Sequence, residues 1–488
     1  MRFVIFLLLT GASIFAEKKP NIIVFYADDL GTGMLSCYTQ ELIKTPHIDK
    51  FATQGIRFNN FYGNNVCAPA RANLLTGRHD GHSFRANKGG LSIKLHRGVV
   101  SQEEYDKILE RTYNERKDFP FIGKMAQDSG YHTSYFGKLG MGYSENHAIM
   151  KLYGFDHYVG LYDSRICWSF YPEFYWDNGE KIMLPHNPKF KNNYPNCPLV
   201  GEEQMTYTED IWLREALEYL EEKKDTPFFM VYSTQLPHGP ASIAPKDHVY
   251  KDRTEWTEKE RVFASMIDKM DKSLGAIVDK LGELNIKNNT IVIFTGDNGH
   301  ESNYYIDPRE KSHNAGRYWD GHKQGLDIFK GGDRRRGIKR HNFEGGLRVP
   351  TIVKWSGKVA SGSQTDHVAT TYDIFATVQD ITGNDQDYKI DGLSFKNTLL
   401  GESQKEHDYI FFKNSTGGSR DALISGDWKL IQELDTNLSN FPEKKRVYTW
   451  NLYNLKDDPL EKTNLIDQHP EKLEELMALV KEANQEIQ

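Results

Sequence analysis

The chain has few cysteines, and beyond its first residues it has no apolar run long enough to cross a membrane. Its four cysteines are too few for a disulfide scaffold, and no pair of them has zinc-ligand spacing. Cys167 and Cys197 are candidates for one bridge in an oxidising compartment, a question that the sequence leaves open. No internal repeat or low-complexity segment occurs. These absences exclude a small disulfide-stapled fold, a repeat protein and an integral membrane segment.

Positive charge is not in excess either. The net charge is −7, so the composition argues against a nucleic-acid partner or a general polyanion binder, and an anionic substrate would need a local basic site. The 488 residues, 38% of them hydrophobic, suffice for one large and one smaller domain. One basic cluster lies in the polar segment 301–341, where it is either a solvated loop or a subsite for an anionic chain. It comprises Lys330, Arg334, Arg335, Arg336, Lys339 and Arg340.

Residues 1–16 read as a signal peptide. Arg2 precedes the apolar run 3–9, and small residues follow as far as Ala16. The apolar core is too short to span a bilayer. We therefore expect an exported protein, periplasmic or secreted.

Buried strands alternate with amphipathic helices along residues 17–400, which indicates an α/β domain with a large, mostly parallel sheet sandwiched by helices. The expected strands are 21–27, 56–62, 131–136, 228–234, 290–295 and 351–355. The expected helices are 45–55, 121–129, 202–224, 258–284 and 371–382. Short strands at 409–413, 421–424 and 428–432, followed by a helix at 470–484, predict a smaller C-terminal domain, 401–488, of antiparallel sheet plus helix.

Two segments, 81–120 and 161–200, show no clear hydrophobic periodicity and are predicted to be irregular loops over a site. The second is rich in aromatic residues. These rings either stack on sugar rings or fix the loop in place, and the sequence does not decide between the two. They include Trp168, Tyr171, Tyr175 and Trp176.

The stretch from Cys67 to Gly77 is a candidate nucleophile site. Its residues 70–75 favour a short helix, and Pro69 suits the first helical position. Cys67 would then precede a helix N-terminus, where free N–H groups and the helix dipole favour an anion. Arg71 lies one turn further on. An ordinary capped helix is the alternative.

Polar residues follow several of the predicted strands, at the edge where open α/β sheets place their sites. Each alone also suits an ordinary turn or surface position. They are Asp28, Asp29, Lys138, His238, Asp297 and Asn298, with Lys339 added by the basic segment. The carboxylate and amide oxygens among them suit a hard cation such as calcium.

The string C-x-P-x-R-x-x-x-L-T-G at 67–77 resembles the sulfatase signature. The segments 27–31 (ADDLG), 344–350 (EGGLRVP) and 452–459 (LYNLKDDP) fit the same family in order. The chain is therefore identified as a member of the formylglycine-dependent (type I) sulfatases of the alkaline-phosphatase-like superfamily, and it resembles exported bacterial carbohydrate sulfatases. The resemblance implies an alkaline-phosphatase-like fold and hydrolysis of a sulfate ester.

The resemblance also implies a site. A formylglycine-generating or sulfatase-maturating enzyme would convert Cys67 to formylglycine (3-oxoalanine), and Arg71 would stabilise its hydrate. One calcium ion would be held by Asp28, Asp29, Asp297, Asn298 and residue 67. The sulfate group would be bound by Lys138, His238 and Lys339, with His238 protonating the leaving alcohol.

One position departs from the family pattern. Members commonly carry a histidine where this chain has Gly140, and that histidine assists release of sulfate. Two alternatives therefore stay open: a sulfated-glycan binding protein with impaired turnover, and a phosphodiesterase or phosphonate hydrolase of the same superfamily. Asn298 argues against the second, because the related two-zinc enzymes usually place histidine there.

The expected substrate is a sulfated poly- or oligosaccharide. Export, the aromatic segment and the basic segment all favour it over a small aryl or lipid sulfate. The sugar, the sulfated carbon and the endo or exo mode are not indicated. Candidate contacts on the inferred loops are His82, Arg85, His300, His313, Arg317 and Trp319.

Overall fold

The computed structural model describes residues 18–84, 91–142, 146–190, 196–301, 327–413, 419–434 and 447–485. The predicted signal peptide, 1–16, lies outside these residues, as do four candidate substrate contacts. Those four are Arg85, His313, Arg317 and Trp319.

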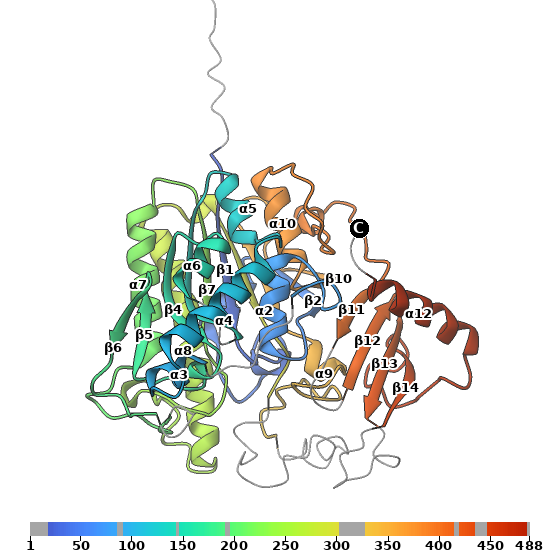
Figure 1. The fold of residues 1–488 in the computed structure, drawn as a ribbon. Coiled ribbons are helices and arrows are strands. Elements are labelled where there is room, and N and C mark those ends of the chain that lie inside the picture. Colours follow the sequence, from blue (N-terminus) through green and yellow to red (C-terminus); the bar gives the residue numbers. More distant parts are fainter. Residues whose placement is uncertain are drawn as a thin grey trace, which may run out of the picture.

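A ten-stranded sheet forms the centre of the molecule (Figure 1). In spatial order its strands are β10 (Ser363–Thr370), β2 (Ile56–Tyr62), β9 (Thr351–Trp355), β8 (Thr290–Gly296), β1 (Asn21–Ala27), β7 (Phe228–Ser233), β3 (His132–Gly142), β4 (His157–Asp163), β5 (Phe174–Asp177) and β6 (Glu180–Met183). The pairs β8–β1, β1–β7, β7–β3, β3–β4 and β10–β2 are parallel, whereas β9 runs antiparallel to both of its neighbours and β5 to both of its own. The prediction of a mostly parallel sheet is confirmed.

Helices cover both faces of this sheet, which explains why its strands read as continuous apolar runs. Alternate residues of β1 divide between two cores, Ile22 and Val24 facing one and Ile23 and Phe25 the other. The first core is closed by α2 (Cys67–Thr76), α5 (Ile122–Asp128) and α10 (Asp373–Thr382). The second is closed by α1 (Pro46–Ala52), α7 (Thr208–Lys223) and α8 (Glu258–Glu283). Shorter helices include α6 (His147–Leu152) and α11 (Lys396–Leu400).

A smaller antiparallel sheet stands beside the β10–β2 edge of the large one (Figure 1). Its strands are β11 (Ile410–Lys413), β12 (Ser419–Ser425), β13 (Trp428–Leu434) and β14 (Tyr448–Asn454). One face packs on α12 (Pro470–Ala483) through Leu476 and Val480. The other packs on Tyr62, Phe343 and Leu347 of the large unit, the last of these on α9 (Glu344–Leu347). The expected strands and terminal helix are present, β14 was missed, and the boundary near residue 401 stays a prediction.

The segment 81–120 was predicted to be an irregular loop, and this prediction is wrong. It contains α3 (Leu91–His96) and α4 (Gln102–Arg116). The helix α4 is mostly polar and buries one narrow face, which includes Tyr105 and Leu109, so its periodicity is faint in the sequence. Its start is fixed by Ser101, whose side chain accepts a hydrogen bond from the Glu104 N–H.

The aromatic segment 161–200 is also more regular than predicted, since it includes β5 and β6. Tyr171 and Tyr175 are buried, and the ring of Tyr175 packs edge-on against Trp212. The Tyr171 hydroxyl donates to the carbonyl of Ile243. Trp168 is the more exposed ring. These contacts favour the packing alternative over sugar stacking for the two tyrosines.

All four cysteines are free, so Cys167 and Cys197 are not bridged. Among the residues that the structure describes, no helix combines the length and the apolar character that a membrane span requires.

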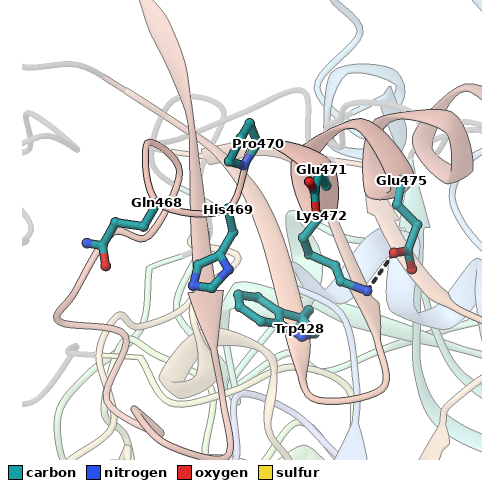
Figure 2. Close-up of a pocket in the computed structure, with 7 residues that line it drawn as sticks. All are labelled: Trp428, Gln468, His469, Pro470, Glu471, Lys472 and Glu475. Atoms are coloured by element: carbon teal, nitrogen blue, oxygen red, sulfur yellow. Dashed lines mark hydrogen bonds and ion pairs between the residues drawn. The ribbon is translucent and has the colours of Figure 1, made fainter.

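A surface pocket on the C-terminal unit is formed where the start of α12 meets β13 (Figure 2). Its lining includes Trp428 and His469, whose rings meet edge to face, and a Lys472–Glu475 ion pair.

Candidate active site

The parallel strands bring distant segments together at one edge of the large sheet. Strand β1 pairs with β8 so that Ala27 lies opposite Gly296, and it pairs with β7 so that Tyr26 lies opposite Ser233. The residues just beyond these ends are Asp28, Asp29, Asp297, Asn298 and, after a short loop, His238. All five are buried. The sequence predicted such a convergence because the carboxyl ends of parallel strands share one edge.

Three carboxylates form the acidic centre of the site. Ligand atoms of Asp28, Asp29 and Asp297 all lie within 4.8 Å of one another. Asp297 Oδ1 accepts the backbone N–H of Asp29 at 3.0 Å and that of Asn298 at 2.8 Å. Burial, reinforced by the charge of Asp28, raises the pKa of Asp297 above its usual range. Buried carboxylates this close together repel one another, so they need cations around them to remain charged.

Arg71 is one of these cations, and it connects the cysteine helix to the strand ends. Its guanidinium donates to Asp297 Oδ2 at 3.0 Å, to the Lys138 carbonyl at 2.6 Å and to Ser233 Oγ at 2.5 Å. Its Nη2 lies 3.6 Å from Asp28 Oδ2. Burial opposes its charge, but Asp297 and Asp28 raise its pKa well above the usual value. Arg71 is therefore a permanent positive charge near Cys67.

Two lysines are the other cations that pair with these carboxylates. Lys138 Nζ donates to Asp28 Oδ2, and Lys339 Nζ donates to both oxygens of Asp29 at 2.6 and 2.8 Å. Burial works against both ammonium groups, but the facing carboxylates raise both pKa values. Both lysines therefore remain charged. Lys138 lies within β3 itself and not, as predicted, in a loop beyond it.

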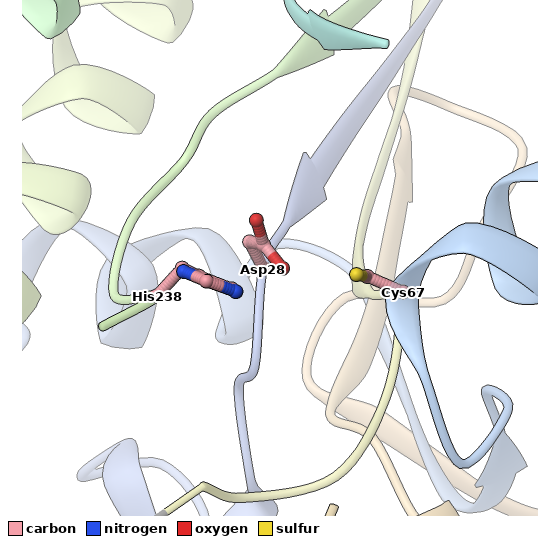
Figure 3. Close-up of side chains that lie close together, drawn as sticks. All are labelled: Asp28, Cys67 and His238. Atoms are coloured by element: carbon pink, nitrogen blue, oxygen red, sulfur yellow. The ribbon is translucent and has the colours of Figure 1, made fainter. Parts of the chain in front are cut away.

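Cys67 is the first residue of α2 and not, as predicted, the residue before it. It is buried, and its Sγ forms a compact group with Asp28 and His238 in which all ligand atoms lie within 4.8 Å of one another. Figure 3 shows the His238 ring directed toward Asp28, with Cys67 on the far side of the carboxylate. Nε2 of His238 lies 3.7 Å from Asp29 Oδ2, and its Nδ1 has no hydrogen-bond partner. Burial, with Lys138 next, lowers the pKa of His238 to about 4.

The oxygen donors of the centre fit a divalent cation. Asp28 Oδ1 and Asn298 Oδ1 are buried and have no hydrogen-bond partner. Orphaned buried oxygens of this kind are costly unless something binds them. Carboxylate and amide oxygens with no nitrogen donor among them match calcium better than zinc. The donor set thus supports a hard-cation site.

Gly140 has a left-handed backbone, with φ of +66°. A Cβ at this position would lie 2.7 Å from Cε and 3.0 Å from Cγ of Lys138. A histidine here would therefore need both a strained backbone and a displaced Lys138.

Of the candidate substrate contacts, His82 lies apart from these residues, whereas the carbonyl of His300 accepts the backbone N–H of Lys339 at 2.7 Å; the other four lie outside the described chain. His82 stacks on His79, its Nδ1 lies 2.8 Å from Asp391 Oδ1, and its Nε2 lies 2.6 Å from the carbonyl of Gln485. His300 lies with its Nε2 3.4 Å from Asp327 Oδ2. Their role in substrate binding stays a prediction.

Much of the basic cluster is used inside the protein. Arg336 stacks 3.9 Å from the Phe343 ring centroid and donates to the Glu461 carbonyl and to Glu433. Arg335 pairs with Asp333. Lys339 enters the acidic centre, and the next residue, Arg340, pairs with Glu301. The cluster is therefore not one open basic surface.

Sequence reasoning missed two residues of this centre. Ser233, the last residue of β7, accepts from Arg71 and donates to the Lys138 carbonyl at 2.7 Å. Asn64 donates its backbone N–H to the Asp297 carbonyl at 2.8 Å, and its side chain reaches Asn73 and Asp80. Their proximity depends on the strand order, which no local pattern encodes.

Comparison with known proteins points to a single family. A family profile described as "Sulfatase" matches residues 20–384, and one described as "N-sulphoglucosamine sulphohydrolase, C-terminal" matches 332–488. An N-acetylgalactosamine-6-O-sulfatase of Bacteroides thetaiotaomicron is 28% identical, covering 97% of this chain and 96% of its own. The human N-acetylgalactosamine-6-sulfatase is 27% identical over 82% of this chain and 70% of its own.

Solved structures agree with the fold. A protein from a study of glycosaminoglycan metabolism by Bacteroides thetaiotaomicron superposes with a TM-score of 0.71 at 25% identity, covering 96% of this chain and 99% of that one. A second structure, solved in complex with a neocarrahexaose, has a TM-score of 0.69 at 21% identity and covers 96% of this chain and 94% of that one. The second likeness concerns the fold alone.

Proposed function

Since the chain belongs to the sulfatase family and is a sulfuric ester hydrolase, we propose that it removes sulfate from a sulfated carbohydrate, with formylglycine formed from Cys67 as nucleophile and one calcium ion. The observation that carries this proposal is the compact group of Cys67, Asp28 and His238 beside a dry cluster of carboxylates. Four cations, Arg71, Lys138, Lys339 and Arg340, also interact electrostatically with residue 67, so an anion at this position would be surrounded by positive charge.

Asp28, Asp29, Asp297 and Asn298 would hold the calcium ion, together with residue 67. When bound, the ion would lower the pKa of a hydroxyl on the hydrated formylglycine, which makes that oxygen a better nucleophile toward sulfur. The formation of formylglycine requires a maturating enzyme as a partner.

The protein's own residues would bind and neutralise the sulfate group. Lys138 and Lys339 are buried, charged and pre-positioned, so their ammonium groups can move from carboxylate to sulfate oxygens over a short distance. Arg71 is fixed by three partners and would hold the hydrate in place. Burial, and after it Lys138, lowers the pKa of His238, and the negative charge of a bound ester would favour its protonated form again, so that His238 would protonate the leaving alcohol.

The names of the relatives support a choice of the first substrate to test. The bacterial relative that covers nearly the whole chain acts, by its name, on 6-O-sulfated N-acetylgalactosamine. The human relative is named N-acetylgalactosamine-6-sulfatase. We therefore place this sugar first among the carbohydrates to be tested, ahead of other sulfated sugars.

The test is release of free sulfate from a panel of sulfated mono-, oligo- and polysaccharides. The protein is made in a host with a formylglycine-generating system, and conversion of Cys67 is verified by mass spectrometry of its peptide. A Cys67→Ala sample, which cannot be converted, is the matched control. Release that depends on Cys67 and on added calcium supports the proposal. Fully converted protein that binds these sugars but releases no sulfate contradicts it, and hydrolysis of phosphate diesters alone favours the phosphodiesterase alternative.

A further inference from the structure

Three lysines gather at the edge of the large sheet opposite the candidate active site. Lys354 lies near the end of β9, where it pairs with Val292 of β8. Because β9 runs antiparallel to β8, its last residues meet the beginning of that strand, whereas the acidic centre follows the strand's end. The turn before β8 supplies Lys287, in the short helix η4 (Lys287–Asn289). The helix α1, which ends just before β2, supplies Lys50.

Lys354 is the buried member of this cluster, with 6% of its surface exposed. It lies on the face of the sheet that α1 and α8 cover, since Ile352, two residues earlier on β9, belongs to that core. The Nζ of Lys354 donates to the side-chain oxygen of Gln54, just beyond the end of α1. An amide oxygen carries only a partial negative charge. The ammonium group is therefore withdrawn from water without a full counter-charge.

The charged groups that act on Lys354 are themselves positive. Its ammonium interacts electrostatically with Lys287, which comes within hydrogen-bonding range, and with Lys50. Burial first, and then these two lysines, lower the pKa of Lys354 to about 8, so it remains mostly charged at neutral pH. Among the residues that the structure describes, none of the three lysines forms an ion pair with a carboxylate. The buried lysines of the active site, Lys138 and Lys339, each face an aspartate instead.

The ends of α1 and α8 do not neutralise this cluster. A helix C-terminus carries about half a negative charge, whereas the cluster holds three full positive charges. A buried charge without a partner is costly. A multiply charged anion would remove the excess, because ammonium groups attract its charge and donate hydrogen bonds to its oxygens.

We propose that Lys354, Lys287 and Lys50 form a second anion site, which binds a tetrahedral oxyanion such as sulfate on the far side of the sheet from the candidate active site. The anion would accept hydrogen bonds from Lys354 and Lys287, and the exposed Lys50 would face it from the solvent side. Its source is either free sulfate or a sulfate group on a carbohydrate chain, since both present the same terminal oxygens. The site goes beyond the proposed function and does not depend on it.

The first experiment counts bound sulfate. Equilibrium dialysis with radioactive sulfate, at an ionic strength held constant with chloride, compares the wild-type protein with Lys354→Met and Lys287→Gln. Lys117→Gln, which removes an exposed lysine at the end of α4, is the matched control for net charge. Sulfate bound at the active site is common to all four proteins, so differences between them report on the lysine cluster.

The wild-type protein and the control should bind one equivalent of sulfate more than Lys354→Met. Lys287→Gln should bind this equivalent at least about tenfold more weakly, because one charge-assisted hydrogen bond is lost. Equal binding by the wild-type protein and Lys354→Met would overturn the proposal.

Melting temperatures decide between an anion site and a lysine with a purely structural role. In chloride, Lys354→Met should melt no lower than the wild-type protein, because methionine has a similar volume and carries no unpaired charge. Millimolar sulfate should then raise the melting temperature of the wild-type protein more than that of the variant, since the general stabilising effect of sulfate acts on both. A variant that melts lower by the same amount in both salts would contradict the proposal. Lys287→Gln gives the same comparison if Lys354→Met does not fold.

A chondroitin sulfate hexasaccharide distinguishes the two sources of the anion. Its binding is measured with Cys67→Ala protein, which cannot form formylglycine and so does not consume the probe, and this protein is combined with either Lys354→Met or Lys117→Gln. Weaker binding with Lys354→Met alone would identify a sulfate group on a chain as the ligand. Unchanged binding of the hexasaccharide, together with the missing equivalent of free sulfate, would identify the free anion. If neither the hexasaccharide nor free sulfate distinguishes the variants, the site does not exist.

Discussion

Gly140 is predicted to be required by this site, so that restoring the family's histidine impairs the enzyme. The backbone at 140 has φ of +66°, where a β-carbon costs about 1–2 kcal/mol. The added Cβ would also lie 2.7 Å from Lys138 Cε. If Lys138 must leave Asp28, a buried ion pair is broken, which costs about 3–5 kcal/mol. Gly140→Ala should therefore lose roughly 4–7 kcal/mol.

Gly357 provides the matched control. It has a similar φ of +74°, but a Cβ there would have no neighbour within 4 Å. Gly357→Ala should lose only the backbone part, about 1–2 kcal/mol. The difference between the two variants, measured by urea or thermal unfolding under one protocol, isolates the displacement of Lys138.

Sulfate release by Gly140→Ala and Gly140→His is measured alongside. Both variants should be slower than wild type, because Lys138 is moved from its place beside Asp28. The reasoning is refuted if Gly140→Ala is as stable as Gly357→Ala, or if Gly140→His turns over faster than the wild-type enzyme.

Three further predictions concern the site and its support. Lysine in Arg71→Lys cannot remake all three hydrogen bonds of the guanidinium. The free energy of unfolding should fall by about 1.5–3 kcal/mol for each bond not remade, and most activity should be lost. An unchanged free energy of unfolding would contradict this. Burial raises the pKa of Glu209 to about 7, although the hydrogen bonds from Thr234 and Gln235 act to lower it. The carboxyl therefore stays protonated to a higher pH in the native state than in the unfolded state. Stability should fall by roughly 3 kcal/mol as pH rises from the unfolded pKa to about 7 and then level off, and this slope should be absent from Glu209→Gln. Removal of calcium with a chelator should lower the melting temperature, and readdition at a hundredfold excess over Kd should restore about 2.7 kcal/mol; Asn298→Ala should show a smaller gain, and an equal gain would place the ion elsewhere.

Local patterns in the sequence were sufficient for most elements of the fold. The apolar runs of β1, β7 and β8 and the long helix α8 were predicted within a residue or two, because strand and helix periods are properties of a few consecutive residues. The faint helix α4 was missed for the same reason, since only one narrow face of it is buried. The residues at the strand ends could be named in advance because a parallel sheet places them all at one edge.

The contacts among these residues were decided by the tertiary structure alone. The backbone N–H of Asp29 meets Asp297 across 268 positions of sequence, and Lys339 meets Asp29 across 310. The pairing of Arg71 with Ser233 and the lack of room at Gly140 follow from the strand order and from the path of β3. The sequence thus determined which chemical groups the protein has and which edge they occupy. Which group neutralises which depends on long-range packing, because a buried charge takes its partner from whatever the fold brings within a few ångströms.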